Sequence, residues 1–443
     1  MASEVFPVLQ LYAIKEPLFP NLKTLKLSVL TRELIPCIPL FLSPRTTTIY
    51  IAFASLPNIP KVIIVSMIST FPTLCPNLQS IELQFLPRDP MITAALSGML
   101  LTGNLDALRI LKVDSPLAEE AHEAIHALTD LHELSVVIEK DPFLLPLVLP
   151  NLTRLTIEYD HGSAWLQMFR GATLGRLESV TFHPRSEEIG PFLEAFEKVA
   201  LATSAHSTLS QFCLKTPYPW DPNYSSLLPF TQLTHLIIEF SCDEGCSSTM
   251  DDDIITNLAR TMPKLDTLQL GEPPCQEIRT GVTTKGFTAL AHYCSDLSAL
   301  RIHFQVASLC APPVNYRMVF DAGSTAPRRG CALRSLDVGE VPVPEDSVLM
   351  VALNLSLIFP NINSIEYDGE NWERVADAVY LSNAIIRCTS KEHHLSTPRT
   401  LVIPPQEPHP RAVVNREPVW PTQQRSTFPS TIPCPPPPAQ WEL

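Results

Sequence analysis

The chain has 443 residues, of which 45% are hydrophobic and 18% charged, and 46 acidic against 32 basic residues give a net charge of −14. This apolar content excludes a globally disordered chain, and the acidic balance excludes a protein whose surface suits nucleic acid or an anionic membrane. Proline is abundant, with 44 residues, and glycine is scarce, with 14, which argues against folds that work through glycine-rich loops.

The chain begins with a short lead-in, residues 1–17. Met1–Gln10 lacks a basic stretch followed by an apolar one, so we predict no secretory signal. No apolar run reaches the about 18 residues of a membrane span. We therefore expect an intracellular protein of the cytoplasm or nucleus, with no membrane contact, whose 11 cysteines are reduced thiols. Because the first repeated motif comes without an amphipathic cap, we also expect that N-terminal sequence is missing.

A motif of the form Leu-x-x-Leu-x-Leu, with other apolar residues as substitutes, recurs along most of the chain. The 13 copies begin 21 to 36 residues apart, at Leu22, Thr46, Leu78, Leu108, Leu131, Leu152, Leu177, Leu209, Leu233, Leu265, Leu297, Leu333 and Ile362. Residues two apart on a strand share one face, so the last two apolar residues of each copy enter the same core. Each copy therefore predicts one short parallel strand. Several copies follow a Pro-Asn pair, as at Pro20, Pro76 and Pro360, where proline ends the preceding helix.

The stretches between the strands show helical spacing of apolar residues. We predict helices over 118–128, 189–201, 253–262, 284–293 and 372–386, the last of which closes the array. Their core-facing residues are Ala121, Ile125, Leu128, Phe192, Phe196, Val199, Val375, Val379 and Ile385. Asp252 or Asp253, and Thr283 or Thr284, are the expected N-terminal caps. The pattern fades over 46–51 and over 310–330.

These elements predict an α/β fold, a leucine-rich-repeat solenoid over residues 18–390. We expect the right-handed α/β horseshoe of ribonuclease-inhibitor-like proteins, with irregular repeats. The alternative is an ordinary α/β domain with leucine-rich strands, which 13 copies in series disfavour. Residues 391–443 form a separate segment in which 13 of the 46 residues from Pro398 onward are proline. We expect a disordered tail with polyproline II character, which either is merely solvated or binds SH3 or WW domains.

Motifs for catalysis and metal binding are missing from the sequence. There is no phosphate-binding loop, no dinucleotide fingerprint, no Gly-x-Ser-x-Gly and no His-Glu-x-x-His. Cys242 and Cys246 lack histidines at zinc-finger spacing, and Asp251–Asp253 lacks the alternation and glycine of a calcium loop and better fits a helix N-terminus. We expect no enzyme, no cofactor and no metal; an enzyme with an unrecognised site is the remaining alternative.

The candidate binding residues lie on the strands between the core positions, where side chains face the concave surface. The residues singled out there are Lys26, Glu82, Lys112, Glu133, Arg154, His235, Gln269, Arg301, Asp337 and Glu366. Their mixed charge suits a protein partner, with arginine as an anchor, rather than nucleic acid. Any single one of them also fits a solvated strand position. We expect the protein to be a monomer.

The segment Leu18-Phe-Pro-Asn-Leu-Lys-Thr-Leu-Lys-Leu27, followed by Leu40-Phe-Leu-Ser-Pro44, resembles the repeat region of fungal (basidiomycete-type) F-box/leucine-rich-repeat proteins. The resemblance covers residues 18–390. It implies that the repeats capture a substrate for ubiquitination by a cullin ligase, while an N-terminal F-box binds the Skp-type adaptor. No F-box precedes Leu18 in this chain, so contact with the adaptor and cullin complex is expected only if an F-box exists upstream.

The sequence thus predicts a non-enzymatic protein–protein interaction module, the substrate-recognition part of an F-box-type ubiquitin-ligase adaptor. The alternative is a repeat-only scaffold whose proline-rich tail recruits SH3 or WW partners.

Overall fold

The structure is a computed structural model that describes residues 17–28, 34–53, 60–103, 105–138, 148–159, 172–185, 192–218, 223–240, 250–271, 281–312, 331–339 and 341–395, with side chains up to residue 384. The chain divides into two compact units, Met1–Glu392 and His393–Leu443. The expected disordered tail from residue 396 onward, most of the lead-in, the Cys242–Cys246 pair and most of the fading pattern over 310–330 lie outside the described residues. Residues 391–395, which were expected to belong to the tail, are helical instead, because the last helix continues to Leu395.

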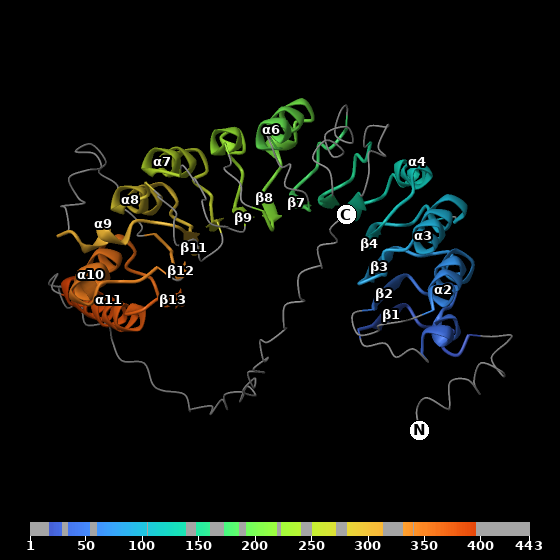
Figure 1. Ribbon diagram of the computed structural model, residues 1–443, viewed down its shortest axis with the longest axis horizontal. Helices are drawn as coiled ribbons and strands as arrows, with labels where there is room; N and C mark the ends of the chain where they lie inside the picture. The colour runs from blue at the N-terminus through green and yellow to red at the C-terminus, as the bar shows by residue number, and fades with distance from the viewer. Residues whose placement is uncertain are drawn as a thin grey trace, which may run out of the picture. The chain divides into compact units, whose positions relative to one another are not determined.

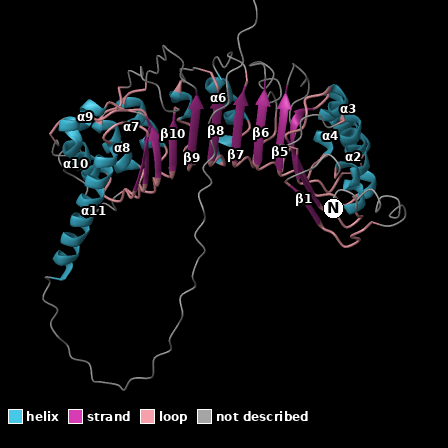
Figure 2. Cartoon of the chain, turned by 60° about the horizontal axis from the view of Figure 1, so that its bottom comes forward, coloured by secondary structure: helices cyan, strands magenta, loops and turns pink. Residues whose placement is uncertain are grey.

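One parallel sheet runs through the first unit, and its strands lie side by side in the order of the sequence (Figures 1 and 2). Its 13 strands are β1 (Thr24–Leu27), β2 (Thr48–Ala52), β3 (Ser80–Gln84), β4 (Ile110–Pro116), β5 (Glu133–Ile138), β6 (Arg154–Tyr159), β7 (Ser179–Pro184), β8 (Gln211–Thr216), β9 (His235–Phe240), β10 (Thr267–Leu270), β11 (Ala299–Ile302), β12 (Ser335–Gly339) and β13 (Ser364–Tyr367). The register of the sheet places equivalent motif residues of neighbouring strands side by side. Leu25 lies beside Ile49, for example, and Leu268 lies beside Leu300. The prediction of one parallel strand per motif copy is confirmed, even for the weak copy that became β2.

Helices return the chain from one strand to the next. The α-helices are α2 (Lys61–Leu74), α3 (Pro90–Thr102), α4 (Glu119–Ala127), α6 (Phe192–Ala202), α7 (Asp252–Thr261), α8 (Thr284–Tyr293), α9 (Val306–Cys310), α10 (Val348–Ile358) and α11 (Trp372–Leu395). The 3₁₀ helices are η1 (Ile35–Phe41), η2 (Ala205–Ser207), η3 (Tyr224–Leu227) and η5 (Glu345–Ser347). The helices from α2 to α10 lie on one face of the sheet, and the other face carries no helix in the part of the chain that the structure describes (Figure 1). We call this other face the strand face.

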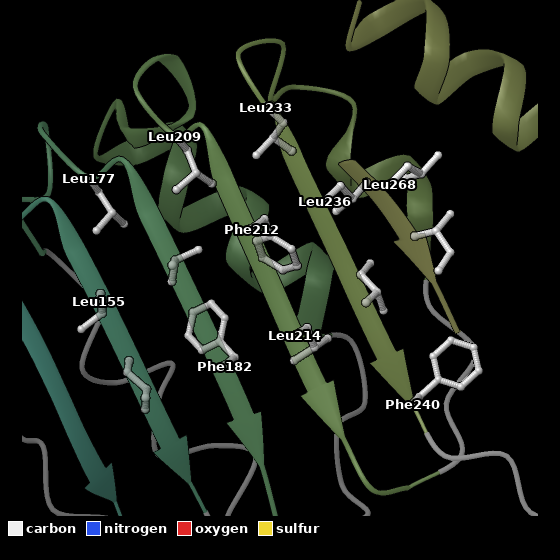
Figure 3. Close-up of a cluster of buried hydrophobic side chains, with 14 of the residues drawn as sticks. Leu155, Leu177, Phe182, Leu209, Phe212, Leu214, Leu233, Leu236, Phe240 and Leu268 are labelled. Carbon is white, nitrogen blue, oxygen red and sulfur yellow. The ribbon is translucent and has the colours of Figure 1, made fainter. Parts of the chain in front are cut away.

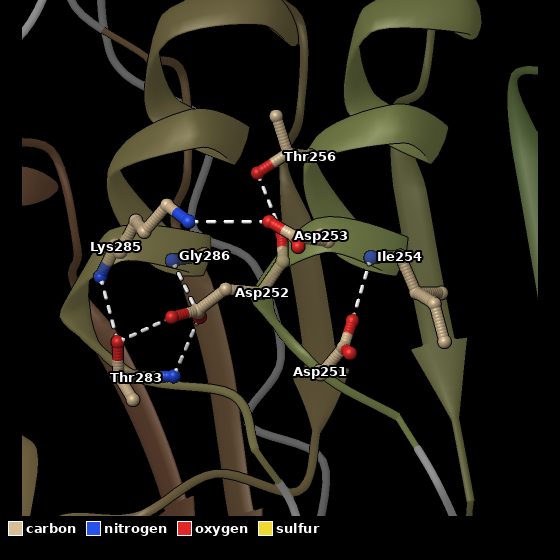
Figure 4. Close-up of polar contacts among 8 residues, drawn as sticks. All are labelled: Asp251, Asp252, Asp253, Ile254, Thr256, Thr283, Lys285 and Gly286. Atoms are coloured by element: carbon tan, nitrogen blue, oxygen red, sulfur yellow. Dashed lines mark hydrogen bonds and ion pairs between the residues drawn. The ribbon is translucent and has the colours of Figure 1, made fainter.

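The predicted helices are found, with differences at their ends. The predicted helix 284–293 coincides with α8, and Thr283 caps it as expected by accepting a hydrogen bond from the Lys285 N–H at 3.1 Å. The cap of α7 was predicted wrongly. Asp251, rather than Asp252 or Asp253, accepts from the Ile254 N–H at 2.8 Å (Figure 4), because the carboxylate of Asp252 is bound to the next repeat.

The motif residues and the inner sides of the helices form one continuous core (Figure 3). In its middle, Phe196 of α6 packs on Phe182 of β7 and Phe212 of β8, with ring centroids 5.5 and 5.3 Å apart. Burial of each such side chain contributes about 1.5–3 kcal/mol to folding, so the repeated motif is the main source of stability.

Five predicted core positions need comment. Leu22 and Leu27 of the first motif copy are only partly buried, because β1 is the first strand of the sheet. Tyr367, the last motif residue, is exposed rather than buried, because β13 is the last strand of the sheet. Helix α11 covers the neighbouring Ile365, whose backbone N–H donates a hydrogen bond to the Tyr380 hydroxyl. Val199 of α6 is only partly buried, and the side chain of Ile385 lies outside the described residues.

Candidate functional site

The strand face carries its side chains in rows, because aligned parallel strands place equivalent residues side by side. The first row takes the first residue of each strand and runs from Thr24 on β1 to Ser364 on β13. The second row lies two residues further along each strand, from Lys26 on β1 to Glu366 on β13. Thirteen strands therefore present a continuous surface rather than a single pocket.

All ten candidate residues lie in these two rows, half-buried or exposed. Lys26, Glu82, Lys112, Gln269, Arg301, Asp337 and Glu366 belong to the second row, and Glu133, Arg154 and His235 to the first. The structure thus places them on one surface, and it separates them into two groups, one on β1 to β6 and one on β9 to β13.

Within the first group, two cations share one carboxylate. The Lys112 Nζ lies 2.8 Å from Glu133 Oε1, and the Arg154 Nη1 lies 3.8 Å from Glu133 Oε2. In the second group the Arg301 Nε lies 3.0 Å from Asp337 Oδ2. Such partly exposed pairs contribute only about 0–1 kcal/mol to stability. Their main consequence is orientation, because each pair directs its long side chains along the strand face.

The remaining candidates also have neighbours on the face. The Lys26 ammonium lies over the Tyr50 ring, 5.0 Å from its centroid, and Gln84 donates to Glu82 at 2.6 Å. His235 Nε2 lies 3.7 Å from Asp266 Oδ2. Gln269 and Glu366 continue the second row beside Arg301 and Asp337.

A third row of charged residues was missed by the sequence reasoning. It consists of Glu158 on β6, His183 on β7, Lys215 on β8 and Glu239 on β9. These strands have six residues rather than four, so the alternation continues two positions beyond the motif. The sequence carries a partial signal for this row. On each of these strands the polar residue after the last motif position is followed by Tyr159, Pro184, Thr216 or Phe240, and all four are buried.

The third row is electrostatically coupled. The Lys215 Nζ lies 2.7 Å from Glu239 Oε2. Burial lowers the pKa of His183, and the nearby Lys215 ammonium lowers it further. This imidazole is therefore more readily kept neutral than an exposed histidine.

The only cysteine on the described part of this face is Cys213, in the second row. Burial raises the pKa of its thiol to about 11, so the thiol stays protonated and is a poor nucleophile.

The acidic segment Asp251–Asp253 is a structural network between two repeats (Figure 4). Asp252 accepts hydrogen bonds from the N–H groups of Thr283 and Gly286, each at 2.8 Å, and Asp253 pairs with Lys285 at 3.1 Å. All three carboxylates are engaged with helix N-termini or a lysine. Among the residues that the structure describes, no group of three or more His, Cys, Asp and Glu side chains is placed to hold a metal ion.

None of the described helices is both long and apolar enough to cross a membrane. Comparison with known protein families and with curated proteins finds no match for this chain.

Proposed function

We propose that the chain is a leucine-rich-repeat solenoid of the ribonuclease-inhibitor-like kind and acts inside the cell as a non-enzymatic protein-binding module. The observation that supports this function best is the strand face itself. Parallel sheets in α/β proteins are normally covered by helices on both faces, whereas this sheet leaves one face to rows of polar side chains.

The chemistry of that face favours a protein partner. Cations and carboxylates alternate and pair with one another, as Arg301 does with Asp337. A nucleic-acid site needs an excess of positive charge, whereas protein interfaces combine mixed polar contacts with a few arginine anchors. We therefore place the partner on the two rows that hold the ten candidate residues.

We further propose that the partner is a substrate for ubiquitination and that the chain is the substrate-recognition part of an F-box-type adaptor. The support for this role is the resemblance of the repeat sequences. A longer product that includes the upstream reading frame should recover the Skp-type adaptor on immunoprecipitation, and recovery of none would remove this part of the proposal.

The binding face is tested with charge reversals. Arg154→Glu and Arg301→Glu together should abolish capture of the proteins that the unaltered chain recovers from its cells, because both anchors then repel their partners. Arg374→Glu is the matched control, since Arg374 is an exposed, ion-paired arginine of α11. An identical set of captured proteins for all three chains would contradict binding on the strand face.

The proline content of residues 398–443 favours a second candidate, a scaffold that recruits SH3 or WW domains. Deletion of these residues separates the two functions, because only the scaffold loses its partners.

A further inference from the structure

The outward faces of α2 and α3 carry almost no charge. The two helices pack side by side on the helix side of the sheet, and α4 follows next to α3 (Figures 1 and 2). The 14 residues of α2 and the 13 residues of α3 include a single charged side chain, Lys61, although 18% of the whole chain is charged. Lys61 pairs with Asp89, the N-cap of α3, so neither helix presents a free charge to solvent.

Apolar side chains on these two helices are open to solvent instead. Val62 of α2 is 64% exposed, and Met91 and Leu101 of α3 are 50% and 48% exposed. The loop that leads into α3 exposes a further apolar side chain, Phe85. Exposed side chains of this kind contribute little to the stability of the fold, and where they gather on one surface they mark an interaction site.

Each helix turns one row of residues outward, and the residues of a row are three or four positions apart. The rows are Val62, Ser66, Ser69 and Thr73 on α2 and Met91, Ala94, Gly98 and Leu101 on α3. Residues at this spacing share one side of a helix. A Cβ added at Gly98 would meet nothing within 4 Å. The row on α3 is therefore low at its centre, and a partner can approach the helix closely there.

Hydroxyl groups on this surface already have partners within their own helices. The Ser69 hydroxyl donates to the Val65 carbonyl at 2.9 Å, and the Thr102 hydroxyl donates to the Gly98 carbonyl at 2.6 Å. A hydroxyl that keeps such a bond costs little to bury. An apolar partner can therefore cover these positions without leaving their donors unsatisfied.

One border of this surface is acidic. Helix α4 packs beside α3, and its Glu119, Glu120 and Glu123 side chains are exposed. None of the three pairs with a cation of the described residues. His126 lies near Glu123, but burial lowers the pKa of this imidazole, so at neutral pH it is uncharged and does not balance the carboxylates. The uncharged surface is thus bordered on one side by three carboxylates that can bind cations.

We propose that the outward surface of α2 and α3 binds an amphipathic α-helix of a second protein. The apolar side of that helix packs on the two rows, and an edge rich in lysine or arginine faces the glutamates of α4. Packed helix axes lie about 8–10 Å apart, so one helix laid over α2 and α3 touches both rows. The site goes beyond the proposed function, because it lies on the helix side of the sheet, away from the strand face.

Charge favours this occupant over two others. A second copy of the chain would bring the same surface to a two-fold interface, and that surface has no free cation to meet the glutamates. An anionic lipid surface would be repelled by the same carboxylates and by the net charge of −14. A basic amphipathic helix matches both the apolar rows and the acidic border.

The test measures the binding of labelled helical peptides of about 18 residues to the full chain by fluorescence anisotropy. All the peptides carry leucine at the spacing of the rows, and they differ along one edge, which holds lysine, glutamine or glutamate. The lysine-edged peptide should bind about tenfold more tightly than the glutamine-edged one, and this advantage should shrink at high salt. The glutamate-edged peptide should bind most weakly. Equal binding of the three peptides, or binding of none, would overturn the proposal.

Gly98→Arg separates docking from folding. The space around Gly98 is open and arginine has a higher helix propensity than glycine, so the melting temperature should not fall. Binding of the lysine-edged peptide should weaken at least about tenfold. Gly175→Arg is the matched control, since a Cβ added there also meets nothing within 4 Å. Met91→Gln with Leu101→Gln repeats the test if Gly98→Arg melts lower. Equal binding to the row variant and the control would overturn the site.

The acidic border has its own variants. Glu120→Gln with Glu123→Gln should reduce binding of the lysine-edged peptide to that of the glutamine-edged one, whereas Glu373→Gln with Asp377→Asn, on the exposed side of α11, should leave it unchanged. Sedimentation velocity and flotation with phosphatidylcholine vesicles test the other occupants. A dimer, or vesicle binding, that Gly98→Arg abolishes would overturn the proposal. None of these results bears on the strand face, so the proposed function stands or falls separately.

Discussion

Replacement of Asp252 by alanine should destabilise the junction between α7 and α8 strongly. Its Oδ1 accepts from the Thr283 and Gly286 N–H groups, each at 2.8 Å, and its Oδ2 accepts from the Thr283 hydroxyl at 2.7 Å. A hydrogen bond to a charged group contributes about 1.5–3 kcal/mol. The site is half-buried, so water replaces part of what is lost, and we expect Asp252→Ala to lower the free energy of unfolding by about 3 kcal/mol.

The two neighbouring aspartates provide matched controls of the same charge. Asp251→Ala removes an N-cap and should cost about 1 kcal/mol. Asp253 is 81% exposed and only pairs with Lys285, so Asp253→Ala should cost less than about 0.5 kcal/mol. The expected order of destabilisation is therefore Asp252, then Asp251, then Asp253.

The measurement combines urea unfolding, followed by circular dichroism, with native-state hydrogen exchange of the Thr283 and Gly286 amides. Exchange is needed because a repeat array opens locally without unfolding as a whole. Faster exchange at these two amides in Asp252→Ala alone is expected. An Asp252→Ala variant no less stable than Asp253→Ala would refute the assignment of this carboxylate as the link between repeats.

Three further changes test other parts of the structure. Gly286→Ala should lower stability by about 1–2 kcal/mol despite alanine's higher helix propensity, because an added Cβ would lie 2.8 Å from Asp252 Oδ1; a more stable variant in urea unfolding would contradict this. Burial lowers the pKa of His183 in the folded state, so the unfolded chain binds a proton at this residue more readily. The stability of the chain should therefore fall as the pH drops through about 6.5, the ordinary pKa of histidine. His183→Gln should reduce the difference between the urea midpoints at about pH 7.5 and about pH 5.5, and an unchanged difference would count against this role of His183. Trp372→Ala should cost about 3–5 kcal/mol, since this fully buried ring packs edge-on against Phe304, and proteolysis should then begin at the last repeat; cleavage starting elsewhere would argue against α11 as the closing helix.

The pattern of apolar residues was sufficient to predict the strands. Leu111 and Val113, like their equivalents in every copy, lie on one side of a strand because alternation is a property of the local chain. In the structure the ten candidate residues lie on the opposite side of the same strands, as alternation requires. It did not reach the third row, because the motif ends one residue before Glu158 and His183.

Contacts between repeats could not be read from the sequence. The carboxylate that caps α7 was misassigned because Asp252 bonds to Thr283, 31 residues away, in preference to its own helix. The pair of Arg88 and Glu158 joins residues 70 positions apart.

The sequence by itself therefore determined that the fold is α/β with one parallel strand for each motif copy, and it determined which side of the sheet the motif residues face. The tertiary structure decided which charges meet, which carboxylate links two helices and that Phe85 is exposed. The physical reason is that side-chain alternation depends on neighbouring residues alone, whereas lateral contacts depend on how strands whose motifs begin 21 to 36 residues apart are stacked.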